Sequence, residues 1–159
     1  MRRYLNILLM SIAMVFVACD KDDENNDDNE RFFIREIYTW GGTMSVTQDD
    51  SSVFTQADVL VDVDFFDKDY LRIVMNQVKF SEKMPIQLDM TIDSIKYVVG
   101  DENLEFGGNN IVPQAMGGPF PQYTITGFTG KTKDGQIDFS MMCGKYPLSF
   151  SGKLLFASN

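Results

Sequence analysis

The stretch Ala57-Asp58-Val59-Leu60-Val61-Asp62-Val63-Asp64-Phe65 alternates between two kinds of side chain with a period of two. Its odd-numbered positions are all apolar, and its even-numbered positions include three aspartates. A period of two is the side-chain period of a β-strand that buries one face. We therefore expect the apolar set (Ala57, Val59, Val61, Val63 and Phe65) to point into a core. Asp58, Asp62 and Asp64 are expected to face water.

The same period recurs on both sides of this stretch. Residues 35–48 predict a strand broken at Gly41-Gly42, and residues 86–92 predict a second clean strand. The apolar phase slips by one residue after Ile92, which predicts a β-bulge or strand end near Asp93-Ser94.

The last third of the chain reads as three further strands, over residues 123–132, 136–143 and 147–156. Asp134-Gly135 between the first two is a strong signal for a two-residue hairpin turn. Gly127 and Gly130 lie inside the first of these strands, where glycine often marks a bend or a close approach of the chain.

Together these patterns predict about seven or eight short strands and no helix beyond the N-terminal segment. The predicted fold class is all-β, an antiparallel meander β-barrel over residues 32–159, with a β-sandwich as the alternative. A barrel of about eight strands is either just filled by its side chains or just able to hold one small ligand. The bulky set expected to point inward favours filling: Val61, Phe65, Met90, Phe139, Met141 and Phe150.

The N-terminal segment has the pattern of a secretory signal. Arg2 and Arg3 precede an uncharged apolar run, Ile7–Val17, which is too short to span a bilayer. Phe16-Val17-Ala18-Cys19 resembles a bacterial lipobox, which implies that residues 1–18 are removed and that Cys19 carries a lipid. The alternative is an ordinary secretory signal in which Cys19 is incidental.

Residues 19–31 are expected to form an acidic tether, because residues 20–30 contain seven acids and one lysine and little that could be buried. Lys21, Asp22, Asp23 and Glu24, directly after Cys19, resemble the export signal of Bacteroidota lipoproteins. That resemblance implies an outer-membrane lipoprotein exposed on the cell surface, with a periplasm-facing lipoprotein as the alternative. A generic acidic spacer is the other interpretation.

The whole arrangement resembles the calycin-like (lipocalin-like) β-barrel lipoproteins of Bacteroidota. The resemblance rests on Met84-Pro85-Ile86, on the segment 123–127, on Asp134-Gly135 and on the closing segment 148–154. It implies a barrel over about residues 33–156 and no established activity. Trp40 precedes Gly41-Gly42, so the Gly-x-Trp motif of the lipocalins proper is absent.

Composition excludes several function classes. The net charge of -9 disfavours nucleic acid as a partner. The chain has no histidine, so it can form neither a Ser-His-Asp triad nor a histidine-ligated metal site. Cys143 shares the phase of Ile137, Phe139 and Met141, which predicts a buried core residue rather than a nucleophile. No cofactor is expected.

Two groups of residues are candidates for a site. Asp62, Asp64, Asp67 and Asp69 cluster near a strand end and could hold Ca²⁺, although Lys68 among them favours a solvated edge. Aromatic and apolar residues could instead meet a ligand: Trp40, Ile111, Met116, Phe120 and Tyr123. Most of these lie in the Gly/Pro-rich loop 106–122, which is either a lid or partner-binding loop, or a packed connection that closes the barrel end.

Three functions remain open from the sequence. The first is a non-enzymatic binding module, anchored to the membrane by its lipid, for a small apolar or glycan ligand or for a partner protein. The second is a structural or accessory surface lipoprotein with a filled barrel and no small ligand. The third is a hydrolase that uses a carboxylate pair.

Overall fold

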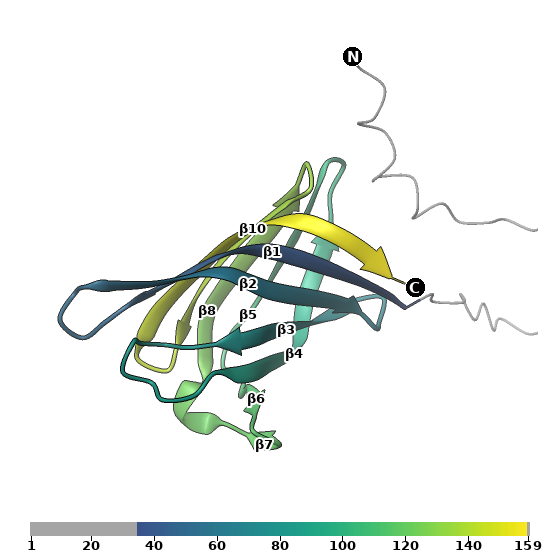
Figure 1. The fold of residues 1–159 in the computed structure, drawn as a ribbon. Helices are drawn as coiled ribbons and strands as arrows, with labels where there is room; N and C mark the ends of the chain where they lie inside the picture. The colour runs from purple at the N-terminus through teal and green to yellow at the C-terminus, as the bar shows by residue number, and fades with distance from the viewer. Residues whose placement is uncertain (1–34, 159) are drawn as a thin grey trace, which may run out of the picture. The chain divides into compact units, whose positions relative to one another are not determined.

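The fold was analysed in a computed structural model, which describes residues 35–158. These residues belong to one compact unit, Phe33–Asn159. Its elements are β1 (Glu36–Thr47), β2 (Val53–Phe65), β3 (Tyr70–Val78), β4 (Leu88–Val99), β5 (Asn103–Gly108), β6 (Gln114–Ala115), β7 (Gly118–Pro119), the 3-10 helix η1 (Pro121–Tyr123), β8 (Ile125–Lys133), β9 (Gln136–Cys143) and β10 (Tyr146–Ser158). Figure 1 shows the fold and labels most of these strands.

Eight of the strands close into an antiparallel barrel. The order is β3-β2-β1-β10-β9-β8-β5-β4, and β3 also pairs with β4, so the sheet has no free edge around the ring. Apart from the closing β1–β10 pair, neighbouring strands of the ring follow one another along the chain, with only β6, β7 and η1 between β5 and β8. The predicted meander barrel is confirmed, and the sandwich alternative is wrong.

β2 shows where alternation predicts burial and where it fails. Val59, Val61 and Val63 are buried as expected. Ala57 is exposed, contrary to the prediction, because Asp58 has a φ of 55° and the register with β1 shifts between Gly42 and Met44. That bulge reverses the phase of the strand before Val59.

The slip in β4 is confirmed. Ser94 has a φ of 59°, and the register with β3 shifts between Leu71 and Ile73, so three steps on β4 face two on β3. The start of this strand was predicted too early, since β4 begins at Leu88 and Ile86 is exposed. β1 differs from its prediction as well, because it runs through Gly41-Gly42 without a break.

The C-terminal strands follow their predicted pattern closely. Asp134 and Gly135, with φ angles of 52° and 72°, form the turn between β8 and β9, and buried and exposed residues alternate along the whole of β9. Gly127 has a φ of 58° and lies at a bulge between Thr126 and Thr129. Near the chain end, a register shift opposite Thr39 and Trp40 leaves Leu155 without a partner on β1 and turns Phe156 outward.

Residues 109–124 fill a gap in the barrel wall. β5 pairs only with the last part of β4, from Lys96 to Val99. Beside the first part of β4, Ala115 of β6 pairs with Met90, and Ile111 exchanges two backbone hydrogen bonds with Ile125 of β8, at 3.0 and 2.7 Å. The segment is therefore a packed connection at one end of the barrel (Figure 1).

The barrel interior is packed with its own side chains. Buried hydrophobic residues from all eight ring strands form one core, and four phenylalanine rings lie in contact within it (Phe106, Phe128, Phe139 and Phe150). Of the six residues expected to point inward, five are buried and Phe65 is partly buried. Gly130 and Gly152 occupy inward positions. A Cβ on Gly130 would lie 2.2 Å from the Phe106 ring, and one on Gly152 would lie 2.8 Å from the Phe150 ring.

We predict that Gly130→Ala lowers the free energy of unfolding by about 1–3 kcal/mol, because the added methyl group overpacks the Phe106 ring and the Phe139 Cβ. Gly118→Ala is the matched control, since a Cβ there meets nothing within 4 Å. Urea unfolding followed by circular dichroism measures both. Equal stability of the two variants would show that the interior has room to spare.

Cys143 supplies a second test of the core. It is fully buried, and its Sγ lies 4.0 Å from the Met90 sulfur. Burial raises the pKa of its thiol to about 12. Because the thiol binds its proton more tightly in the folded state, its protonation favours folding. This contribution is fully present below the pKa of the thiol in the unfolded chain, about 8.5. It is lost as the pH rises through the higher pKa of the folded state.

We therefore expect iodoacetamide at pH 8 to leave Cys143 unmodified in the folded protein and to modify it once urea unfolds the chain. Peptide mass mapping, which separates Cys143 from Cys19, measures this. Fast labelling of Cys143 without denaturant would contradict the packed interior.

Candidate functional site

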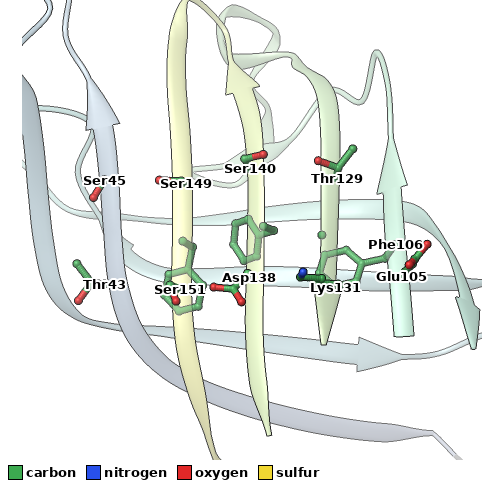
Figure 2. A pocket seen from close by; sticks show the side chains of 13 residues that line it. Thr43, Ser45, Glu105, Phe106, Thr129, Lys131, Asp138, Ser140, Ser149 and Ser151 are labelled. Carbon is green, nitrogen blue, oxygen red and sulfur yellow. The ribbon is translucent and has the colours of Figure 1, made fainter. Parts of the chain in front are cut away.

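A hollow lies on the outer wall of the barrel, across β1, β10, β9, β8 and β5. It has a volume of about 640 Å³. Nine polar side chains line it (Thr43, Ser45, Glu105, Thr129, Lys131, Asp138, Ser140, Ser149 and Ser151). Figure 2 shows these side chains on adjacent strands, and we call this surface the hydroxyl groove.

Strand register arranges the groove in two rows that cross the strands. In the first row Ser45 pairs with Ser149, Ser149 with Ser140, and Ser140 with Thr129. All four side chains of this row are hydroxyls.

The second row runs parallel to the first. Thr43 pairs with Ser151, Ser151 with Asp138, Asp138 with Lys131, and Lys131 with Glu105. Its hydroxyls lie on β1 and β10, and its charged groups lie on β9, β8 and β5.

These polar groups are almost unused by the protein itself. Of the nine, Glu105 alone makes a side-chain hydrogen bond to another described residue, accepting one from Asn103 Nδ2 at 3.2 Å. Lys131 and Asp138 are register neighbours, yet neither forms an ion pair within residues 35–158. The groove thus presents hydrogen-bond donors and acceptors that are available to a ligand in exchange for water.

The groove is hollow because small side chains face outward over rings that face inward. Phe106, Phe139 and Phe150 form its floor and are at most 5% exposed. Serines and threonines occupy six of the nine outward positions that line it. Longer side chains at these outward positions would fill the hollow.

Elsewhere on the outer wall, two carboxylates of β2 are held by hydrogen bonds from other side chains. Asp62 accepts hydrogen bonds from Thr39 Oγ1 at 2.6 Å and Asn76 Nδ2 at 2.9 Å. Arg35 donates to both Asp64 oxygens, at 2.8 and 2.5 Å, and Arg72 Nη1 lies 3.6 Å from Asp64.

The four predicted calcium ligands do not meet. Asp64, expected to face water, is 4% exposed because Arg35 and Arg72 cover it. Asp67 and Asp69 lie in the exposed turn after β2, where Asp67 Oδ1 accepts a hydrogen bond from the Asp69 backbone N–H. No group of three or more carboxylate or cysteine side chains in residues 35–158 is arranged to hold a metal ion.

The predicted ligand-contacting residues lie at several places rather than in one site. Trp40 is 5% exposed within the core, and its Nε1 has no hydrogen-bond partner among the described residues. Tyr123 stacks between Phe80 and Phe120, with ring centroids 4.7 and 4.9 Å away, and burial raises the pKa of its hydroxyl.

Ile111 packs partly buried against the core. Met116 is 67% exposed at the tip of the β6–β7 hairpin. The sequence thus predicted residues of the aromatic cluster around Tyr123 and did not predict the hydroxyl groove. The available signal was serine and threonine recurring in the outward phase, as at Thr43 and Ser45 or Ser149 and Ser151.

The predicted lipidation site Cys19 and export signal (Lys21, Asp22, Asp23 and Glu24) lie outside the described residues, as do the predicted signal peptide and tether. Within residues 35–158, no helix has the length and apolar character needed to cross a bilayer. No protein family, curated protein or solved structure matches this sequence.

The arginine-covered carboxylate can be tested directly. We expect Asp64→Asn to lower the free energy of unfolding by about 1–2 kcal/mol, because the amide loses its charge-assisted hydrogen bonds, discounted for the exposure of both arginines. Asp67→Asn should change stability little, since asparagine can keep the turn hydrogen bond. Equal losses in thermal or urea unfolding would contradict this assignment.

Proposed function

We propose that this protein is a non-catalytic binding module whose recognition surface is the hydroxyl groove and whose ligand is a glycan. One observation carries the proposal: eight polar side chains with no side-chain hydrogen bond or ion pair to another described residue line a single hollow of about 640 Å³. On the neighbouring wall, by contrast, Asp62 and Asp64 are hydrogen-bonded to other side chains.

A glycan fits this chemistry better than the other ligands considered. Serine and threonine hydroxyls both donate and accept, as sugar hydroxyls do, so each contact can form in either direction. The net charge of -9 disfavours a polyanion. A small apolar ligand is less well supported, since the interior positions are taken by buried hydrophobic side chains.

A second candidate function is docking of a partner protein through an apolar part of the wall. Gly41 and Gly42 of β1 lie in a smaller hollow of about 300 Å³, together with Leu60 of β2 and Leu155 of β10. Leu60 and Leu155 are 43% and 55% exposed, which favours contact with another apolar surface. This corresponds to the accessory-protein hypothesis.

We further propose that the domain is displayed on the outer membrane by a lipid on Cys19, with the periplasm-facing orientation as the alternative. The support is the lipobox-like segment and the acidic residues after it. In Gram-negative cells that make the protein, Cys19→Ala should abolish palmitate labelling and membrane retention, whereas Cys143→Ala should leave both unchanged. Membrane retention of Cys19→Ala would contradict the anchor.

The glycan proposal is tested on an array of neutral oligosaccharides with the purified protein. We expect binding to some of them, and an affinity at least about tenfold lower for Ser140→Ala/Ser149→Ala, which removes two neutral hydrogen bonds of about 1 kcal/mol each.

The matched control is Thr55→Ala, an exposed hydroxyl on β2 outside the groove. Absence of binding to every neutral oligosaccharide would overturn the glycan proposal. Equal loss in Thr55→Ala would move the site away from the groove.

A further inference from the structure

We propose that the groove binds an extended, neutral glycan chain that lies across the strands rather than along them, with about four sugar residues in contact. This inference rests on the proposed function and adds the direction, length and charge of the ligand.

The groove is longer across the strands than along them. Its second row spans five adjacent strands, from Thr43 on β1 to Glu105 on β5, and four inter-strand steps of about 4.8 Å give a length of about 19 Å. Along any one strand it includes at most two outward positions, such as Ser149 and Ser151, which lie about 7 Å apart.

Longer side chains close the groove in the strand direction. On β9 the outward positions beyond Ser140 and Asp138 are Met142 and Gln136. On β10 they are Pro147 and Lys153. A ligand running along a strand would meet these residues after at most two hydroxyls, whereas one running across the strands meets hydroxyls on four successive strands.

The spacing of the first row suits a chain of sugars. Ser45, Ser149, Ser140 and Thr129 place one hydroxyl on each strand, at steps of about 4.8 Å. One such step is close to the length of a pyranose residue in an extended chain, so successive sugars can each meet one hydroxyl. Four hydroxyls therefore correspond to about four residues.

The charges restrict which glycan fits. The first row is neutral, and the second carries Asp138, Lys131 and Glu105 together near β8 and β5. One ammonium between two carboxylates gives this end a net negative charge, which disfavours uronic acids and sulfated sugars. A neutral chain uses the first row along its full length.

The first test measures affinity against chain length by calorimetry, with oligomers of one to six residues of the neutral glycan that binds best on the array. We expect affinity to rise at least about tenfold from the disaccharide to the tetrasaccharide and to change less than about twofold beyond it. A monosaccharide that binds as tightly as the tetrasaccharide would overturn the extended mode while leaving glycan binding intact.

The second test separates the two directions with variants at the ends of the first row. Ser45→Ala and Thr129→Val lie on β1 and β8, three strands apart in the row, and both should weaken binding of the tetrasaccharide at least about threefold. An along-strand ligand on β10 would depend on Ser149 and Ser151 and be insensitive to these two variants. Unchanged tetrasaccharide affinity in both variants would contradict the crossing mode, whereas failure of every array glycan would instead refute the proposed function.

Discussion

The packing of phenylalanine rings against two inward-facing glycines is the constraint on which the rest of this structure depends. Phe106 occupies the space beside Gly130, and Phe150 occupies the space beside Gly152, each ring closer than a side chain at the glycine would allow. Phe139 contacts both rings and joins them into one cluster. An eight-stranded barrel has an interior just wide enough for its own side chains, and these rings take that space. Under the proposed function, the ligand therefore meets the outer wall of the barrel.

The outer wall is divided into two parts with opposite chemistry. On one part, Asp62 accepts hydrogen bonds from neighbouring strands and Asp64 accepts them from Arg35, just before β1, and these contacts stabilise the fold. Over β5 and β8 to β10, hydroxyls and charges lie in register without bonding one another. Because a polar group that bonds only water can exchange that water for a ligand at modest cost, the second part is the one suited to recognition.

Much of the fold could be predicted from the sequence, because alternation reports directly which face of a strand is buried. The structure confirms three predictions of this kind: the burial of the valines of β2, the phase slip in β4 and the turn at Asp134-Gly135. Errors arose where a bulge changed the phase without an apolar marker, as at Asp58. The burial of Asp64 was also missed, since it depends on Arg35, which precedes β1, and on Arg72 of β3. The groove was missed for the same reason: serines on β10 and β9 become one surface only when strand pairing aligns them.

The central claim is that ligands bind on the outer wall and leave the interior closed. Methyl-resolved NMR during titration with the neutral tetrasaccharide tests it most directly, because Thr43 and Thr129 carry methyl groups in the groove while Val61 and Ile92 carry them in the core. The account predicts saturable shifts at the two threonine methyls and unchanged core methyls. Shifts confined to Val61 and Ile92 would place the ligand inside the barrel and contradict the account.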